Sequence, residues 1–248
     1  MNIDQNSSAV GRTRTLGQFR AGNQGLSALI SKELVLDVIE RAVVLILFLY
    51  FANRMLRPLA VLITAEIAYP ELFWLAASKN LDAALLVISE LLGVLLILTR
   101  RSATAVSTHP LDWALSLIAV NAPLLAVPAA ASTFMPSQIP AALMFAGMTI
   151  QISAKAALWR SYGLIPANRG VKTGGPYRFV RHPMYFGYTL THIGFLLGFP
   201  SLQNFLLYVA TFLIEVARLL REERILNQDS VYRDYATRVH YRLIPGVF

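Results

Sequence analysis

Long runs of apolar residues alternate with short polar segments along most of the chain. Six of these runs have about the length that a helix needs to cross a bilayer, roughly 17 to 25 residues. They lie at Val35–Asn53, Asp82–Thr99, Trp113–Ala131, Ile139–Trp159, Met184–Phe199 and Leu202–Leu220. The pattern therefore predicts an all-α fold, a polytopic membrane helix bundle with about six transmembrane helices.

The segments between and before these runs complete the predicted organisation. Pro58–Asn80 contains two prolines and two glutamates, so we expect an interfacial or re-entrant piece rather than another span. Residues 1–34 are polar and lack an apolar core followed by a small-residue cleavage site, which predicts a flexible tail and not a signal peptide. We therefore expect the chain to consist of three regions: a cytoplasmic tail at 1–34, about four membrane helices at 35–160, and a C-terminal region at 161–248 with two spans and a cytoplasmic helical segment.

The distribution of lysine and arginine predicts which ends of the helices face the cytoplasm, because cytoplasmic loops carry the excess of these residues. Lys and Arg number four in the tail up to Lys32, two at Arg100-Arg101, six in Lys155–Arg181 and six in Arg218–Arg242. Residues 133–138 and 198–203 carry no charge. We therefore expect a multi-pass protein with both termini in the cytoplasm.

Composition supports a membrane protein and excludes some chemistry. Hydrophobic residues make up 56% of the chain and charged residues 15%, and the mean hydropathy is +0.53. These values lie outside the usual range of soluble domains. The absence of cysteine excludes disulfides, thiolate metal sites and cysteine nucleophiles. The net charge of +8 could suggest nucleic acid, but the basic residues lie between apolar segments, so we expect no nucleic-acid partner.

Three charged residues, Glu40, Arg41 and Glu90, fall in or near apolar runs. A charge within a membrane is costly and usually faces the protein interior. For Glu90 we favour a carboxyl that is paired or protonated against a neighbouring helix, with a functional role as the alternative. No zinc spacing, P-loop or dinucleotide-binding glycine pattern is present, so we expect no metal site.

Residues 174–187 have a composition that suits neither a lipid-facing helix nor an ordinary loop. They include three Gly, two Pro, four aromatic residues, two Arg and a His. Glycine and proline keep the backbone bent and open, so its N–H and C=O groups could face a ligand. Pro183 is suited to the first turn of a helix, whose positive end would then face the loop. Either this segment binds an anionic or polar ligand, or it is a basic loop that caps a membrane helix.

A second group of polar residues follows the sixth apolar run. Arg218 and Glu222 are four residues apart, so they share one face of a helix. They could form a solvated surface pair, which would contribute little. At the mouth of a helix bundle beside the first motif, they could instead bind a zwitterion.

Together the two stretches resemble the isoprenylcysteine carboxyl methyltransferase family and, more distantly, the phospholipid N-methyltransferases. The resemblance covers roughly residues 155–248. It rests on Gly175-Pro176-Tyr177, Arg181-His182-Pro183-Met184-Tyr185, Arg218-x-x-x-Glu222-Glu223, Tyr232 with Tyr235, and Ile244-Pro245.

The resemblance implies a membrane methyltransferase that uses S-adenosylmethionine and has no Rossmann domain. It implies that the cofactor is enclosed at the cytoplasmic end of the last two membrane helices. The residues it assigns to the cofactor are Tyr177, Arg181, His182, Pro183, Tyr185 and Glu223. It assigns Arg218 and Glu222 to the cofactor end or the reacting centre, as catalytic residues. The substrate would be a lipophilic carboxylate, thiol or lipid amine, and for an amine Glu222 or Glu223 could act as the base.

Two departures from the family pattern concern the acceptor side more than the cofactor side. The link Asn227–Val231 is shorter than usual, and Ala154-Lys155 stands where an arginine is expected.

Two other functions are alternatives to a methyltransferase. An NADPH-dependent reductase of the sterol-reductase type shares the His-Pro-x-Tyr motif, although Met184 differs from its usual polar residue. A non-enzymatic transport or channel protein would account for Glu40 and Glu90.

Overall fold

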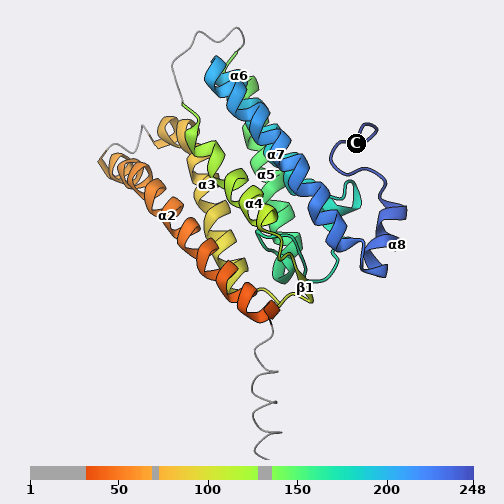
Figure 1. Ribbon diagram of the computed structural model, residues 1–248. Helices are drawn as coiled ribbons and strands as arrows, with labels where there is room; N and C mark the ends of the chain where they lie inside the picture. The colour runs from red at the N-terminus through yellow and green to blue at the C-terminus, as the bar shows by residue number, and fades with distance from the viewer. Residues whose placement is uncertain (1–31, 69–72, 128–135) are drawn as a thin grey trace, which may run out of the picture.

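The computed structural model describes residues 32–68, 73–127 and 136–248, which form a bundle of helices (Figure 1). The helices are α2 (Lys32–Ala68), α3 (Phe73–Thr99), α4 (Pro110–Asn121), α5 (Gln138–Leu158), α6 (Pro183–Gly198), α7 (Leu202–Leu226) and α8 (Ser230–Arg238). The 3-10 turns are η2 (Ala122–Leu125), η3 (Trp159–Ser161) and η4 (Gly175–Arg178). The all-α prediction is confirmed for these residues. A two-stranded antiparallel ladder that the apolar pattern did not predict joins β1 (Ala105–Val106) to β2 (Ala167–Asn168).

Each predicted span coincides with a helix, but the bounds differ. Within the described residues, 138–161 and 202–226 are long and apolar enough to cross a membrane, whereas Leu85–Thr99 and Pro110–Leu125 are shorter apolar helices. The described residues therefore contain two candidate membrane-spanning helices, and the count of six spans stays a prediction.

The predicted interfacial or re-entrant piece at Pro58–Asn80 is not a separate element. Helix α2 continues through Pro58 to Ala68, and α3 already begins at Phe73. Residues 69–72 lie outside the described residues. A proline removes one backbone hydrogen bond from a helix, which usually kinks or ends it. Here the apolar residues that follow Pro58 continue the helix, since apolar surroundings favour internal backbone pairing.

Helix α4 is shorter than the predicted span Trp113–Ala131, whose last four residues lie outside the described part of the chain. The helix begins at Pro110, and the Nδ1 atom of His109 accepts a hydrogen bond from the backbone N–H of Leu111 at 3.2 Å. Pro123 then falls in a 3-10 turn, η2. A proline after the last helical turn cannot continue the backbone ladder, which explains the early end.

Small residues let α5 and α6 approach closely. A Cβ atom added to Gly147 of α5 would lie 2.4 Å from Thr191 Oγ1 and 2.7 Å from the carbonyl oxygen of Gly187. Glycine at such crossings allows backbone contact between membrane helices. The close crossing fixes the start of α6, and with it the motif around His182, against the end of α5.

The charged residues of the apolar runs face the interior, as expected. Arg100 binds Glu40 Oε1 at 2.8 Å and Asp37 Oδ1 at 2.7 Å, and Arg41 binds Asp37 Oδ2 at 2.8 Å. Arg169, from the loop after α5, binds Glu40 Oε2 at 2.5 Å. These five residues form one buried ionic cluster between α2, the end of α3 and that loop.

The favoured interpretation of Glu90 is confirmed. Its Oε1 lies 3.6 Å from the Nζ atom of Lys155 on α5, and Lys155 also donates to Ser89 Oγ at 2.7 Å. Lys155, the residue found where the family resemblance implied an arginine, is thus a buried partner of Glu90 across the α3–α5 interface.

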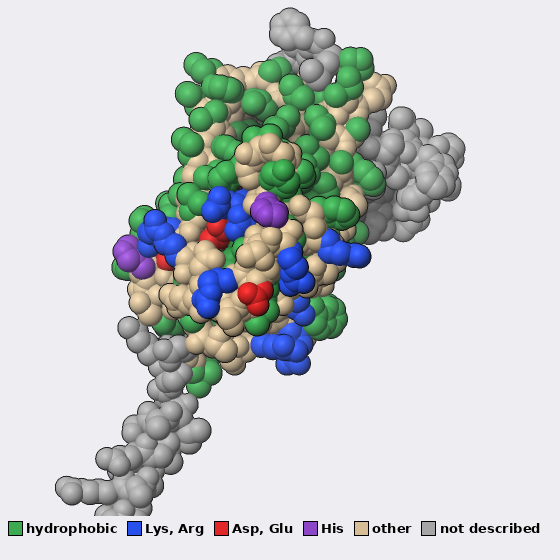
Figure 2. All heavy atoms as spheres, turned by 90° about the vertical axis from the view of Figure 1, so that its right-hand side faces the viewer, with side chains coloured by type: hydrophobic (Ala, Val, Ile, Leu, Met, Phe, Trp, Pro, Cys, Tyr) green, Lys and Arg blue, Asp and Glu red, His purple; other side chains and the backbone are tan. Residues whose placement is uncertain are grey.

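The surface is divided into an apolar part and a charged part. Figure 2 shows hydrophobic side chains over the upper half of this face and most of the charged side chains over the lower half. On α7 the exposed fraction is 74% for Leu202, 58% for Leu206 and 62% for Leu213. A large exposed apolar band next to a basic end is typical of a protein embedded in a bilayer.

Candidate active site

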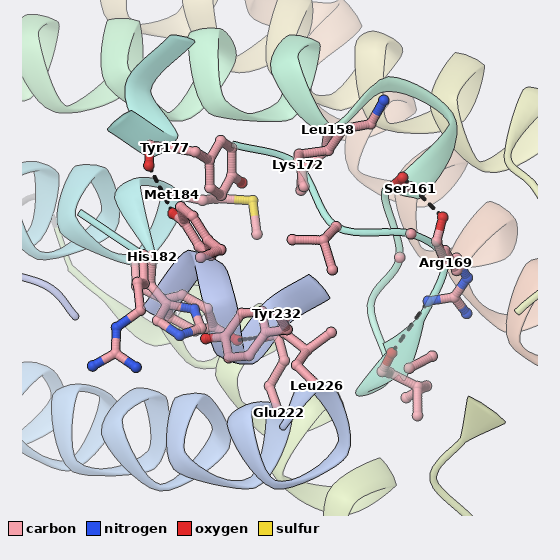
Figure 3. A pocket seen from close by; sticks show the side chains of 18 of the residues that line it. Leu158, Ser161, Arg169, Lys172, Tyr177, His182, Met184, Glu222, Leu226 and Tyr232 are labelled. Atoms are coloured by element: carbon pink, nitrogen blue, oxygen red, sulfur yellow. Dashed lines mark hydrogen bonds between the residues drawn. The ribbon is translucent and has the colours of Figure 1, made fainter. Parts of the chain in front are cut away.

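A pocket lies at the charged end of the bundle, where α5 ends, α6 begins and α7 ends. Four segments contribute to its wall: the loop 158–172, residues 177–185, the last turns of α7 and helix α8. Figure 3 shows Tyr177 and Met184 on one side, Tyr232, Leu226 and Glu222 facing them, and Arg169 farther along the cavity. The first and last lining residues in the sequence, Leu158 and Tyr235, are 77 positions apart, so only the folded chain brings them together.

The motif at 174–187 forms a turn followed by a helix, as predicted. Gly175 has φ of +60°, which favours glycine, and begins the 3-10 turn η4. Helix α6 begins at Pro183 with His182 as its N-cap residue, although the imidazole does not cap the helix.

The backbone N–H groups beside Pro183 do not face a ligand, which corrects that part of the prediction. The N–H of Arg181 donates to the carbonyl of Tyr241 at 2.9 Å, and that of His182 donates to the carbonyl of Arg242 at 2.8 Å. The C-terminal segment occupies these donors. Ligand contacts from this motif must therefore come mainly from side chains, namely those of Tyr177, Arg181, His182 and Tyr185.

Glu223 is the centre of a buried network that holds the motif against the C-terminal part of the chain. Its Oε1 accepts from Tyr232 Oη at 3.1 Å, pairs with Arg181 Nη1 at 2.9 Å and lies 3.3 Å from His182 Nε2. Its Oε2 accepts from Arg242 Nε at 2.7 Å. The pocket lining includes Glu222 but not Glu223 or Pro183. The carboxylate of Glu223 thus lies behind the wall, which it supports.

Arg218 and Glu222 both line the pocket, so the interpretation as a solvated surface pair is wrong. Arg218 is 5% exposed, and its Nη2 donates to the carbonyl of Leu164 at 2.6 Å. Its guanidinium lies 5.4 Å from the ring centroid of Tyr185, whose hydroxyl donates to Glu222 Oε2 at 3.1 Å. Among the ion pairs of the described residues, none joins Arg218 to Glu222 directly. Tyr185 connects them instead.

The phenols of the pocket are neutral groups. Burial raises the pKa of Tyr177 well above its ordinary value and raises the pKa of Tyr235 to about 12. Burial also raises the pKa of Tyr232. The hydroxyl of Tyr235 donates to the carbonyl of Tyr177 at 2.7 Å, and that of Tyr232 donates to Glu223. These side chains can supply aromatic surface and hydrogen bonds, but they cannot act as bases near neutral pH.

One wall of the pocket has no counterpart in the site predicted from the sequence. Residues 163–170 form it, including Leu164, Ile165 and Arg169, and they belong to the segment between α5 and α6. In the sequence, this loop is distinguished only by its basic residues, which predict that it lies on the cytoplasmic side. The Arg169 side chain is oriented by a hydrogen bond from its Nη2 atom to Glu40 Oε2, and these two residues are 129 positions apart in the sequence.

The part of the chain that forms the pocket is similar to one known protein family. Residues 137–233 match the model of the phospholipid methyltransferase family. No individual curated protein matches the chain. The matched region contains α5, α6, α7 and the first residues of α8, and it carries every pocket residue except Tyr235.

The phospholipid methyltransferase match indicates a membrane methyltransferase, which confirms the broader expectation from the sequence. That family is related to the isoprenylcysteine carboxyl methyltransferases, so the resemblance is correct at the level of the wider group. The match leaves out residues 1–136, including α2, α3 and α4.

Proposed function

We propose that this protein is an integral membrane methyltransferase that uses S-adenosylmethionine to methylate a lipophilic acceptor. The observation that carries the proposal is the position of the pocket. All its lining residues except Tyr235 fall within the phospholipid methyltransferase match, and it lies where α5 and α7 end and α6 begins. A pocket at the ends of these apolar helices suits both a water-soluble cofactor and a substrate that partitions into the bilayer.

The residues of the pocket fit S-adenosylmethionine. The cofactor has an aromatic base, a carboxylate, an ammonium group and a positively charged sulfur. Tyr177, Met184 and Tyr232 offer the base an apolar and aromatic surface. Arg218 suits the carboxylate, because its buried Nε has no hydrogen-bond partner among the described residues. Glu222 suits a cationic group, as a carboxylate that receives only a phenol hydrogen bond in the described contacts.

The work of the protein in such a reaction is alignment and exclusion of water. When bound, the cofactor supplies an electrophilic methyl group whose leaving group is a neutral thioether. Arg218, Tyr185 and Glu222 hold donor and acceptor in one orientation, which accounts for much of the rate enhancement in bimolecular reactions. The apolar residues Leu164, Ile165 and Leu226 keep water from the reacting groups. For an amine acceptor Glu222 takes up the released proton, whereas a carboxylate or thiolate needs no base.

The acceptor is a lipid or another lipophilic molecule bearing a carboxylate, a thiol or an amine. The family name favours a phospholipid. Incubation of the protein with lipid extracts and S-adenosylmethionine labelled in the methyl group would identify the acceptor class, since label in an ester, a thioether or an amine is chemically distinct.

Cofactor binding distinguishes the methyltransferase from the alternative functions. In calorimetry of the protein in detergent, we expect S-adenosylhomocysteine to bind and NADPH to give no heat. Tyr185→Ala and His182→Ala should each weaken S-adenosylhomocysteine binding by about 10-fold, the effect of losing one or two polar contacts. Tyr208→Ala is the control, because Tyr208 does not line the pocket. Its ring stacks on that of His192 in α6, with 4.6 Å between the ring centroids. Unchanged affinity in folded Tyr185→Ala protein would contradict the assignment of the pocket.

A labelling experiment tests the proposed topology, in which both termini are cytoplasmic. The chain contains no cysteine, so single cysteines introduce unique labels. Cysteines at Ser137 and Ser201 should react with a membrane-impermeant maleimide from outside intact cells. Cysteines at Ser102 and Thr173 should react only after permeabilisation, because they lie beside basic segments. Outside labelling at Thr173 would put the pocket on the wrong side of the membrane for a cytoplasmic cofactor.

A further inference from the structure

We propose that Glu40, a buried carboxylate of α2, is a positioning residue that holds the wall formed by residues 163–170 in the shape that binds the cofactor. This inference rests on the proposed function, because it assigns a role toward the same pocket. Glu40 itself does not line the pocket. It also lies almost a hundred residues before the start of the family match at residue 137.

The contacts of Glu40 converge on this wall. Its Oε1 accepts from the backbone N–H groups of Leu164 at 2.9 Å and Ile165 at 3.0 Å. Its Oε2 accepts from Arg169 Nη2 at 2.5 Å. All three partners line the pocket. One side chain from α2 therefore fixes both the backbone and a charged side chain of the wall.

The wall is held from the opposite side by the site itself. The carbonyl of Leu164 accepts from Arg218 Nη2 at 2.6 Å, while the N–H of the same residue donates to Glu40. Leu164 thus connects a carboxylate of α2 to the arginine proposed to bind the cofactor. Gly163 permits this arrangement, since a Cβ atom there would lie 2.2 Å from Arg169 Nη1.

A carboxylate suits this position better than a neutral side chain. Buried backbone N–H groups outside regular structure need an acceptor, and Glu40 supplies one for two neighbouring residues. Glu40 also pairs with Arg100 and Arg169, a role that it shares with Asp37, and the Glu40, Arg100 and Arg169 side chains are at most 2% exposed. Removal of one partner from such a group leaves uncompensated buried charge. The position of the wall should therefore depend on the charge of Glu40 as well as its hydrogen bonds.

The consequence is that α2 belongs to the functional unit. The family match begins only at residue 137, yet the wall that completes the matched pocket is fixed by a residue of α2. We expect the matched region to bind the cofactor poorly when Glu40 is altered, although all residues that line the pocket are still present.

The test compares Glu40→Gln with Glu90→Gln in the full-length protein. Both changes neutralise a glutamate that is paired with a buried cation, although Glu40 is fully buried and the Glu90 side chain is 13% exposed. Glu90 pairs with Lys155, however, and no contact among the described residues joins it to residues 163–170. Glutamine at position 40 keeps an acceptor for the two backbone N–H groups but turns a donor toward Arg169. S-adenosylhomocysteine affinity is measured by calorimetry, and amide hydrogen exchange is followed in peptides covering residues 160–172.

We expect Glu40→Gln to weaken S-adenosylhomocysteine binding by at least about 10-fold and to speed exchange at 160–172, as expected for the loss of a charged hydrogen bond. Glu90→Gln should change the affinity by less than about 3-fold, which corresponds to an indirect effect. Wild-type affinity and exchange in folded Glu40→Gln protein would overturn the proposal. If Glu40→Gln does not fold, Glu40→Asp replaces it, since it keeps the charge but withdraws the carboxylate from the wall by about 1.5 Å.

The two readouts separate this inference from the proposed function. If the unaltered protein does not bind S-adenosylhomocysteine, the proposed function fails, but the exchange of Leu164 and Ile165 still decides whether Glu40 holds the wall. If the protein binds the cofactor and exchange accelerates while affinity stays unchanged, Glu40 is structural only and its positioning role is rejected.

Discussion

Arg218→Ala should reduce methyl transfer by at least about 100-fold, the effect of removing one fixed charge-stabilising donor from an active site. Arg218 is buried, lines the pocket and has an Nε without a partner among the described residues. It also holds the carbonyl of Leu164 and lies over the ring of Tyr185. Its loss therefore removes a ligand contact and loosens two parts of the wall. Initial rates with labelled S-adenosylmethionine and the identified acceptor would measure the effect.

Glu222→Ala should have a similarly large effect, and the two effects should not add. Tyr185 connects Arg218 to Glu222, so the three side chains act as a unit, and residues in one network fail together. The double variant should then be little worse than either single variant. Arg224→Ala is the matched control, because Arg224 is an exposed arginine of the same helix outside the pocket lining. Full activity of the double variant would show that Arg218 and Glu222 have no role in catalysis.

Glu223→Ala should have the largest effect on stability, a loss of about 3 kcal/mol or more in the free energy of unfolding, as for a broken buried ion pair. The change leaves Arg181, Arg242, His182 and Tyr232 without their common acceptor. Since these residues belong to the motif, α8 and the C-terminal segment, local opening should occur there first. Equilibrium unfolding in detergent measures the first effect, and limited proteolysis near residues 230–248 measures the second.

Asp234→Ala is the control for this experiment, because Asp234 is an exposed acidic residue of α8. Surface changes of this kind usually shift stability by no more than about 0.5 kcal/mol. A Glu223→Ala protein as stable as Asp234→Ala, with an unchanged cleavage pattern, would show that the network around Glu223 contributes little to holding the C-terminal segment.

Local features of the sequence were sufficient to predict several parts of this protein. Apolar runs of bilayer length predicted helices in the right order, because lipid and protein interiors both require backbone groups to be paired within a segment. Pro183 marked the start of α6, since proline fits the first turn of a helix. The four-residue spacing of Arg218 and Glu222 placed both side chains on one face, and both line the pocket.

In two places, the local sequence pattern did not predict the structure that the chain adopts. Pro58 was part of the reason to predict an interfacial or re-entrant piece at Pro58–Asn80, but α2 stays helical through Pro58 to Ala68. Glu223 follows Glu222 in sequence and resembles it chemically, yet successive residues of a helix point in different directions. Glu222 therefore faces the pocket, whereas Glu223 faces the motif and the C-terminal segment.

The sequence by itself determined the helical membrane class, the start of α6 and the shared face of Arg218 and Glu222, because each depends on the pattern within one segment. Only the tertiary structure decided which distant groups complete the site. The contact of Glu40 with Leu164 joins residues 124 positions apart, and that of Tyr185 with Glu222 joins residues 37 positions apart. Periodicity describes which face a side chain occupies, but the neighbour on the other side depends on how the helices pack. For that reason the wall at 163–170 and its support from α2 became visible only in the folded protein.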